Sequence, residues 1–375
     1  MSLIAACGGA GDADTDAAAA VATSGELPDD IKLHAVWDIT GPVAYAGLGA
    51  SKGAQLAIEE INESAFLGDG VSLSFTETDT AAEIERASSE MTKALADPEI
   101  AAILGPVSGQ QAAAVAPMIE QSKVPTVFIQ AGSDGVVIGD YTFRATAPMG
   151  TYYHLAAEHL AAEGLTDVAV LYNGTFPTFA QLGEQVFTDL AQENDLNIVS
   201  SDGVQSTTQD FTAKAQAIAA ADPDAVAMFL IAPQFITAVT QLRQAGYEGQ
   251  VLATSVQAAG NVSQAGANAD GTIYPVDFSV AMEEETSAAF TAAFTEKYGE
   301  EPDPYAAEGY DAVWWIARAI EASGDASHEG IQRGMAEVAA DGFEGAMGAL
   351  TFDGNDMRVE GVLVQWDGTA EQLVK

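Results

Sequence analysis

Hydrophobic and polar residues follow two different periods along the chain. From Ile31 to Trp37 every second residue is apolar, and Val71–Phe75 repeats this period of two, which predicts strands with one buried face. Between them, small and apolar residues fall at helical spacing from Ala50 to Ile61. This part of the chain therefore predicts a strand, a helix and a second strand.

Later apolar runs have the length of buried strands: 100–104, 124–129, 168–172, 225–231 and 362–366. Segments with helical spacing lie between them: 110–121, 152–163, 211–221, 235–245 and 306–322. Short continuous apolar runs are typical of parallel strands that are buried on both faces. The alternation of the two kinds of segment predicts an α/β fold with parallel sheets flanked by helices.

An internal similarity and the length of 375 residues favour two domains. Residues 95–104 and 220–229 each contain the end of a predicted helix, an Asp-Pro turn and the start of an apolar run. Proline ends a helix because its ring clashes with the preceding turn. Such turns also recur in unrelated α/β proteins, so the similarity alone is suggestive only.

The single cysteine, Cys7, lies between Ile4 and Gly9 in a stretch of small residues that resembles a bacterial lipobox. No basic or long apolar stretch precedes it, and Ile4 stands where leucine is usual, so we interpret Met1–Leu3 as an added start on a truncated signal peptide. Residues 8–30 carry almost no large apolar side chains and are expected to form a flexible tether. The interpretation is a lipid-anchored chain; the alternative is an incidental free thiol at a frayed terminus.

The formal charge of −42 comes from 55 acidic and 13 basic residues. Such a surface repels phosphate backbones and anionic headgroups, so we expect no nucleic-acid partner and membrane attachment only through a lipid. No apolar run reaches the roughly 20 residues of a membrane span. The acidity is spread along the chain, which favours a solubility surface, such as that of a salt-adapted organism, over a cation site; no dense Asp-x-Asp-x-Asp-Gly loop is present.

Motifs of enzymes and metalloproteins are absent from the sequence. It contains no Walker loop, no Gly-x-Gly-x-x-Gly after a strand, no His-Glu-x-x-His and no Gly-x-Ser-x-Gly. His154 and His159 are five residues apart, which does not place them on one helix face. We expect no cofactor, no metal and no catalysis.

Two polar turns follow predicted neighbouring strands, at 105–110 and 130–135. The carboxyl ends of strands in a parallel sheet are where ligands bind, and the N–H groups at a helix start suit a carboxylate. Ser108 and Ser133 add hydroxyl groups. These residues could also serve only as turn formers and caps; together the two turns favour a binding site.

Several motifs are specific in their combined order and spacing: Thr40–Ala44 with Gly47, Gly53–Asn62, Gly105–Ser108, Val124–Pro125, Phe143–Thr146 and Tyr305–Val313. With them, residues 31–370 resemble the Leu/Ile/Val-binding family of periplasmic solute-binding proteins, which serve ABC importers. The resemblance implies a type I periplasmic-binding fold with two doubly wound lobes and three hinge crossings. The crossings are expected near Arg144–Pro148, Tyr274–Asp277 and Gly345–Thr351. Lobe 1 would then comprise 31–145 and 277–346, and lobe 2 would comprise 146–276 and 347–375.

The resemblance also implies where the ligand binds. The carboxylate-holding turns would be 107–109 and 131–133, with Gly109 where the family often has serine. In the second lobe, an aromatic cover falls near 176–179, Ile231 replaces a tyrosine, and 255–257 lacks the acid that receives a ligand ammonium. The expected ligand-binding residues are Trp37, Tyr45, Val107, Ser108, Gly109, Ala131, Ser133, Phe176, Phe179, Ile231, Ser255 and Gln257.

A buried ammonium without a carboxylate partner costs several kcal/mol. Either another acid serves, with Asp134 and Asp277 as candidates, or the ligand carries no cation there. Trp37, Tyr45, Phe176 and Phe179 would suit an apolar or aromatic body, although Trp37 and Phe179 could equally be core residues.

The predicted function is therefore that of an extracytoplasmic receptor, in the periplasm or at the cell surface. It would act as a monomer and deliver a small carboxylate, amino-acid-like ligand or aromatic acid to an ABC permease. One alternative is the sensing module of a signalling receptor with the same fold. The other is an enzyme with a doubly wound sheet, which the missing motifs disfavour.

Overall fold

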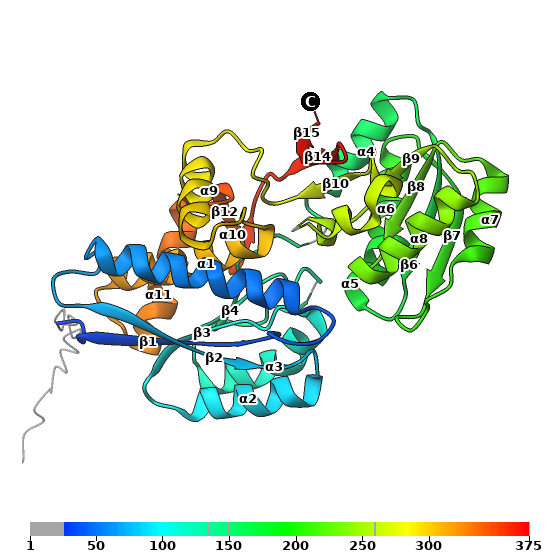
Figure 1. Ribbon diagram of the computed structural model, residues 1–375. Coiled ribbons are helices and arrows are strands. Elements are labelled where there is room, and N and C mark those ends of the chain that lie inside the picture. Colours follow the sequence, from blue (N-terminus) through cyan, green and yellow to red (C-terminus); the bar gives the residue numbers. More distant parts are fainter. Residues whose placement is uncertain (1–25, 134, 149, 259, 375) are drawn as a thin grey trace, which may run out of the picture.

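The computed structural model describes residues 26–133, 135–148, 150–258 and 260–374. Among these residues, eight strands form one sheet and seven form another, in the orders β11-β12-β13-β5-β4-β3-β1-β2 and β15-β14-β10-β9-β8-β6-β7. Helices cover both sheets, so the chain forms two α/β lobes (Figure 1). This is the type I periplasmic-binding architecture expected from the sequence.

The elements of the first lobe are β1 (Asp30–Trp37), α1 (Ala44–Glu63), β2 (Ser72–Asp79), α2 (Ile84–Ala96), β3 (Ile100–Leu104), α3 (Gly109–Ser122), β4 (Thr126–Phe128), β5 (Thr142–Arg144), α9 (Glu285–Tyr298), α10 (Pro304–Ser323), α11 (His328–Asp341), β11 (Phe343–Gly345), β12 (Gly348–Asp353) and β13 (Asp356–Arg358). Those of the second lobe are α4 (Tyr153–Ala162), β6 (Asp167–Asn173), α5 (Pro177–Gln181), the π-helix η1 (Leu182–Val186), α6 (Phe187–Glu193), β7 (Asn197–Val204), α7 (Thr212–Ala221), β8 (Ala225–Phe229), α8 (Ala232–Gln244), β9 (Gln250–Leu252), the 3-10 segments η2 (Ser255–Gln257) and η3 (Val262–Ala269), β10 (Ile273–Val276), β14 (Val362–Trp366) and β15 (Glu371–Leu373).

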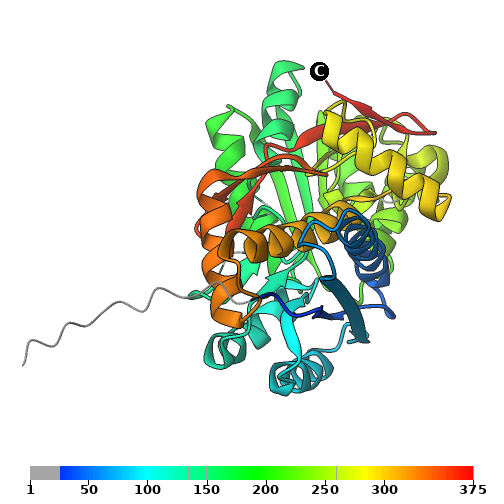
Figure 2. The same cartoon turned by 90° about the vertical axis from the view of Figure 1, so that its left-hand side faces the viewer.

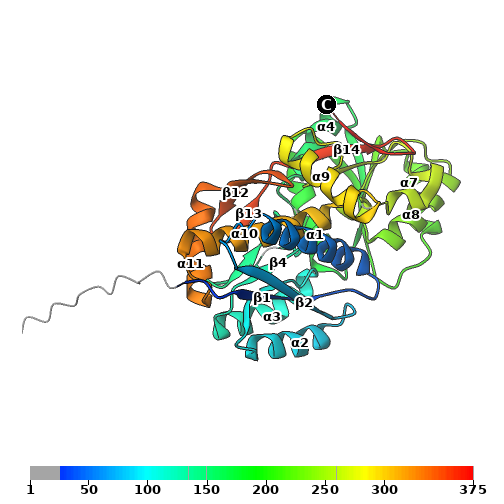
Figure 3. The ribbon, with the colours of Figure 1, turned by 60° about the vertical axis from the view of Figure 1, so that its left-hand side comes forward.

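The alternation along β1 divides its side chains between two cores. Ile31, Leu33, Ala35 and Trp37 are buried in the core beneath α1 and α10, whereas Val36 belongs to the core beneath α2 and α3. Figure 3 shows α1 and α10 above β1 and β2, with α2 and α3 below. The period of two read from the sequence therefore corresponds to a sheet with a hydrophobic layer on each face.

Helices α1 and α10 pack at very short range because glycines face backbone. A Cβ at Gly53 would lie 1.8 Å from the Ala306 carbonyl oxygen, and one at Gly309 would lie 2.4 Å from that of Ala50. Figure 2 shows the two helices, blue and orange, against each other. This contact places the start of α10 beside the start of α1.

The two lobes repeat one strand order. The parallel strands run β2-β1-β3-β4-β5 in the first sheet and β7-β6-β8-β9-β10 in the second. Each Asp-Pro turn noted in the sequence, at 97–98 and 222–223, precedes the third strand of its lobe. The internal similarity thus falls at equivalent positions of the two lobes.

Two sequence-based predictions need correction. The run 362–366 is a strand, β14, but it pairs antiparallel with β10 instead of parallel. The third crossing near 345–351 is also wrong, because β12 and β13 belong to the first sheet and the chain passes over after Arg358. The physical reason is that β13 pairs with β5, where Arg144 Nε donates to Asp356 Oδ1 at 2.8 Å.

Candidate functional site

A cavity lies between the two lobes. Its described lining from the first lobe is Val43, Tyr45, Ala46, Val107, Ser108, Gly109, Gln130 and Tyr305. Its lining from the second lobe is Phe176, Thr178, Phe179, Ile231 and Val256. Apart from Tyr305, these residues follow the carboxyl ends of parallel strands in both sheets. The cavity therefore sits where each strand order reverses, the usual ligand position in doubly wound sheets.

One end of the cavity is formed by the start of α3. Ser108 is the N-cap residue with extended backbone angles (φ −93°, ψ 129°), but its side chain makes no cap hydrogen bond. The first N–H groups of a helix have no partner within the helix, and its amino-terminal end carries partial positive charge. Together the Ser108 hydroxyl and these N–H groups suit an anionic ligand group.

Gly109 and Ser133 are tightly juxtaposed at this end. A Cβ at Gly109 would lie 2.3 Å from Ser133 Oγ and 3.3 Å from Thr178 Oγ1. The Ser133 hydroxyl thus occupies the space that a side chain at 109 would need. Thr178 comes from the second lobe, so the two lobes approach closely here.

The turn after β4 is fixed by a buried arginine. Arg144 Nη1 donates to the carbonyl oxygens of Ala131 and Ser133, at 2.9 and 2.8 Å. Ala131 and Ser133 are buried and lie outside the described cavity lining, whereas Gln130, with φ 52°, belongs to it. The sequence-predicted turn is therefore next to the cavity, and Gln130 is its residue in the described lining.

Aromatic side chains form the remaining walls. Phe176 and Phe179 meet edge to face with centroids 6.3 Å apart, and Asn173 Oδ1 accepts the N–H groups of Thr175 and Phe176. Across the cavity, the rings of Tyr45 and Tyr305 lie 5.6 Å apart. Four rings thus surround a space suited to an apolar or aromatic body.

Tyr305 is a contact that the sequence analysis did not assign to the site. Its side chain is 1% exposed, and its hydroxyl has no hydrogen-bond partner among the described residues. Tyr305 lies in the Tyr305–Val313 motif, but it enters from a helix start and not from a turn after a strand. A buried hydroxyl without a partner is a natural contact for a ligand polar group.

Three expected ligand residues lie elsewhere. Trp37 is fully buried in the core, where its indole N–H donates to Glu77 Oε2 at 3.1 Å. Ser255 and Gln257 are buried in η2, and neither belongs to the described cavity lining. Of this segment, Val256 is the residue that reaches the cavity.

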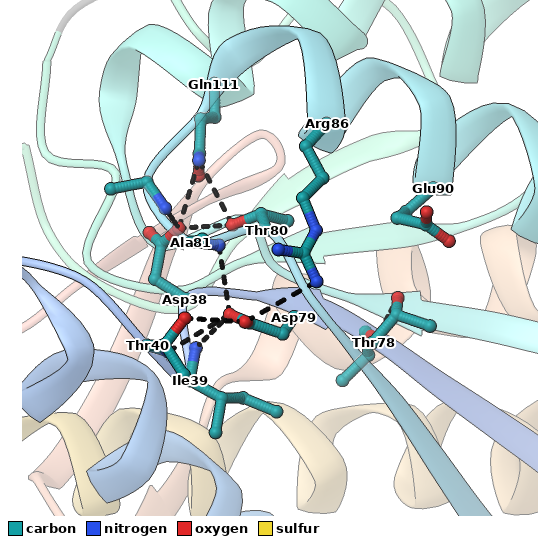
Figure 4. A network of polar contacts seen from close by, with 12 residues as sticks. Asp38, Ile39, Thr40, Thr78, Asp79, Thr80, Ala81, Arg86, Glu90 and Gln111 are labelled. Carbon is teal, nitrogen blue, oxygen red and sulfur yellow. Dashed lines mark hydrogen bonds and ion pairs between the residues drawn. The ribbon is translucent and has the colours of Figure 1, made fainter.

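The loop that carries Val43 and leads into α1, where Tyr45 lies, is held by two aspartates at the strand ends (Figure 4). Asp79 Oδ1 accepts the backbone N–H groups of residues 39, 40 and 81, and Arg86 lies 3.6 Å from its other oxygen. Partial burial opposes ionisation, but the hydrogen bonds outweigh it and lower the pKa of Asp79 to about 2. Asp79 is therefore an anion that anchors this wall of the cavity at any physiological pH.

The second aspartate of this network, Asp38, connects the loop to α3. It accepts hydrogen bonds from the Thr80 hydroxyl, from the N–H of Ala82 and from Gln111 Nε2. Gln111 belongs to the first turn of α3, which begins beside the cavity. The network thus joins the loop after β1 to the helix start that bears Ser108.

A direct hydrogen bond spans the lobes beside the cavity. Gln110 Nε2 at the start of α3 donates to the Thr175 carbonyl oxygen at 3.2 Å. Because these residues belong to different lobes, the structure presents the lobes in contact at this point. The ligand space is thereby bounded on two sides.

Metal chemistry finds no support in the described part of the chain. There, no group of three or more His, Cys, Asp or Glu residues is arranged to hold a metal ion. His154 Nδ1 instead lies 2.8 Å from the Thr151 carbonyl oxygen. In the same ranges, no helix combines the length and apolar character needed to cross a bilayer. Cys7 and Asp134 lie outside the described residues.

The model of the family of periplasmic binding proteins matches residues 30–370. The chain belongs to this family. A curated relative, the Leu/Ile/Val-binding protein homolog 7 of Brucella abortus (strain 2308), is 23% identical over 90% of this chain and 89% of its own.

Solved structures of transporter substrate-binding and solute-binding proteins share the fold. The branched-chain amino acid binding protein LivJ of Streptococcus pneumoniae, in complex with isoleucine, is 24% identical, with a TM-score of 0.82 over 92% of this chain and 99% of its own. A solute-binding protein of Rhodopseudomonas palustris BisB5, in complex with 3,4-dihydroxybenzoic acid, is 22% identical, with a TM-score of 0.80 over 92% of this chain and 97% of its own.

Proposed function

We propose that the chain is an extracytoplasmic receptor of an ABC importer, and that it binds a small carboxylate with an apolar or aromatic body. The observation that carries the proposal is the composition of the cavity between the lobes. Its described lining combines a helix start and hydroxyl groups at one end with four aromatic rings, and contains no acidic or basic side chain. Binding without reaction is the use that fits such a lining.

The carboxylate would be held by Ser108, by the Gly109 N–H and by Ser133, as the resemblance implies. Tyr305 and Gln130 would contact polar groups elsewhere on the ligand. Phe176 and Phe179 would stack on its body from the second lobe. Hydrogen bonds to a charged group are worth about 1.5–3 kcal/mol, so the helix start would dominate orientation.

Among carboxylates, this cavity favours aromatic acids over α-amino acids. The related structures hold isoleucine in one case and 3,4-dihydroxybenzoic acid in the other. An α-amino acid brings an ammonium group, and a buried ammonium needs an acidic partner. Asp277, one of the two acids considered for that role, is fully buried, lies outside the described cavity lining and accepts a hydrogen bond from Thr146.

Closure of the lobes would follow from ligand contacts with both. A ligand shifts a conformational equilibrium only by binding one state more tightly, and here the closed state supplies both walls. The closed receptor would then dock on the permease as a monomer.

Calorimetry with benzoate, 3,4-dihydroxybenzoate and L-leucine tests the proposal. We expect the aromatic acids to bind more tightly than leucine. Ser108→Ala should weaken binding about ten- to a hundredfold through loss of a hydrogen bond to a charged group. The exposed Ser122 ends the same helix, and Ser122→Ala should bind as the unmodified protein does. Unchanged affinity in Ser108→Ala would exclude this end of the cavity as the carboxylate site.

Attachment to the membrane would take place through acylation of Cys7. A single acyl chain anchors only marginally, so the native form should carry more than one. Mass spectrometry of membrane-extracted protein is expected to show a mature terminus at a modified Cys7. An unmodified thiol, or a terminus upstream of it, would contradict the anchor and leave the ligand proposal intact.

A further inference from the structure

Two fully buried carboxyl groups meet where the chain passes between the lobes. Asp277 directly follows β10, on the second crossing, and is 1% exposed, while Glu308 lies on α10 of the first lobe and is 0% exposed. The two side chains lie close enough to act on each other electrostatically and to share a hydrogen bond. Such a bond between two carboxyl groups requires one proton, because two carboxylates have only acceptors.

The contacts of Asp277 identify it as the ionised partner. Thr146 Oγ1, from the first crossing, donates to Asp277 Oδ2 at 3.0 Å, and the backbone at residues 277 and 278 also donates to this carboxylate. Asp277 Oδ1 and both oxygens of Glu308 accept no hydrogen bond from a donor among the described residues. We therefore assign the shared proton to Glu308, which would donate it to Asp277.

The groups around the pair do not neutralise a second charge. Those that act on it or feel it are Asp303 at the N-cap of α10, Tyr305 and Asp311 on α10, and Tyr152 before α4. None of these residues is a cation. Burial, then the charge of Asp277 and the hydrogen bond to it, raises the pKa of Glu308 well above its ordinary value of 4.5.

The position of the pair links it to the lobes and to the cavity. Thr146 and Asp277 belong to two of the connections between the lobes, and such connections absorb the backbone changes of a hinge motion. Glu308 lies one helical turn after Tyr305, which lines the cavity. A change in the bond between Asp277 and Glu308 therefore acts on the hinge and on a cavity wall together.

We propose that the Asp277–Glu308 pair is a proton-operated latch that holds the second crossing against α10 and favours the lobe arrangement seen here. With one proton, the two side chains attract each other. Loss of that proton places two like charges in a buried site without a cation among its neighbours, and separation of the crossing from α10 relieves their repulsion. A rise in pH thus opens the lobes.

Small-angle X-ray scattering of ligand-free protein tests the latch without reference to any ligand. Profiles are recorded from about pH 5 to about pH 9 in about 1 M salt, where a Debye length of about 3 Å screens surface repulsion. We expect the radius of gyration to increase with pH. Glu308→Gln should keep the low-pH profile throughout, because the amide donates to Asp277 and does not titrate.

Two further variants make the result specific. Asp277→Asn removes the like charge and should also abolish the pH dependence, which covers the case in which Glu308→Gln does not fold. Asp311→Asn is the matched control, since Asp311 is a buried acid on the same helix that bonds the N–H groups of Ala346 and Met347; it should still open with pH. A wild-type profile independent of pH, or opening retained in Glu308→Gln, would overturn the latch.

The latch also predicts a linked change in affinity. Any ligand that bridges the lobes should bind up to about tenfold more weakly per pH unit across the transition, since one proton is involved. Benzoate or L-leucine, whichever binds, serves as the probe, and Glu308→Gln should show a flat pH profile. If neither compound binds, the proposed ligand class fails, while the scattering result still decides the latch.

Discussion

Gly109 and Ser133 share a space that accommodates only one side chain. The Cβ of an alanine at 109 would come within 2.3 Å of Ser133 Oγ, a distance that real Cβ atoms essentially never show. The Ser133 hydroxyl, from the turn after β4, thus fills this space, whereas a serine at 109 would place a hydroxyl there from the start of α3. Only one of the two positions, 109 or 133, can place a hydroxyl group in this space.

This exclusion predicts the outcome of moving the hydroxyl. Gly109→Ser alone should weaken binding of the best aromatic acid at least tenfold, because the new side chain and Ser133 collide. Gly109→Ser combined with Ser133→Ala should recover most of the affinity, and Ser133→Ala alone should lose about 1.5–3 kcal/mol. Calorimetry on the three variants checks this. If the double variant loses as much binding free energy as the two single variants lose together, the two positions do not compete for this space.

Single residues were predictable from the sequence where local chemistry decides their position. Ser108 and Phe176 line the cavity because they follow strand ends, a feature that the order of apolar runs displays. Trp37 shares its period of two with Leu33, and that period already indicated the core in which it lies. Tyr305 was missed because the packing of α10 on α1, far away in sequence, brings it to the site.

The contact between α1 and α10 gives a prediction for whole elements. Gly53→Ala should destabilise the protein by about 1–3 kcal/mol, since the added methyl group would sit 1.8 Å from the Ala306 carbonyl oxygen and must push the helices apart. Alanine is more favourable than glycine in a helix interior by about 1 kcal/mol, which is too small to offset the cost of moving the two helices apart. Denaturant unfolding measures the change in the free energy of unfolding.

Gly174→Ala is the control for this substitution. Its Cβ would meet atoms at 3.7 Å or more, which is ordinary van der Waals contact, and its φ is not in the left-handed region. Its stability should remain within about 0.5 kcal/mol of the unmodified protein. Equal stability of the two variants would show that α1 and α10 can adjust without cost.

Elements were predictable from the sequence, but their assignment to a sheet was only partly so. The runs 100–104 and 362–366 coincide with β3 and β14. An apolar run does not reveal its partner strand or its direction, which is why β14 was expected to be parallel. The third crossing was placed too early because the pairing of β13 with β5 depends on Arg144 and Asp356, which are 212 residues apart.

At the scale of the whole molecule, buried acids make stability depend on pH. Burial raises the pKa of Asp311 to about 7, although the N–H groups of Met347 and Ala346 act in the opposite direction, and the pKa values of Asp277, Glu308 and Glu371 are raised as well. The folded state then binds protons more tightly than the unfolded chain. The stability that these buried acids contribute is fully present below their ordinary pKa values, and it is lost as pH rises through the raised values.

Asp311→Asn should therefore flatten part of this dependence. Between the ordinary value of 3.8 and about 7, the wild-type free energy of unfolding should fall by up to about 1.4 kcal/mol per pH unit more steeply than that of the variant. Asp325→Asn is the control, because hydrogen bonding at Ser327 lowers the pKa of Asp325 and its titration lies below this window. Parallel pH curves for wild type and Asp311→Asn would contradict the assignment.

Repulsion among the charges that give the net charge of −42 destabilises the folded chain, whereas its ion pairs stabilise it. The described ion pairs, such as Lys93 with Glu90 and Arg333 with Asp325, are mostly solvent-exposed, and exposed pairs contribute about 0–1 kcal/mol each. Salt weakens these attractions, but it also weakens repulsion among a much larger number of unpaired carboxylates. Repulsion should prevail, because the 55 acidic residues outnumber the 13 basic ones.

We therefore expect the melting temperature at neutral pH to rise as salt increases from about 0.01 M to about 1 M, where the Debye length falls from about 30 Å to about 3 Å. Differential scanning calorimetry with sodium chloride and with potassium chloride measures the effect, and both salts should act alike because screening depends on ionic strength. Sucrose at matched osmolality is the control, since it stabilises by exclusion from the surface without screening charge. A melting temperature that stays flat or falls with salt would mean that the ion pairs, and not the excess of carboxylates, govern the electrostatics of this fold.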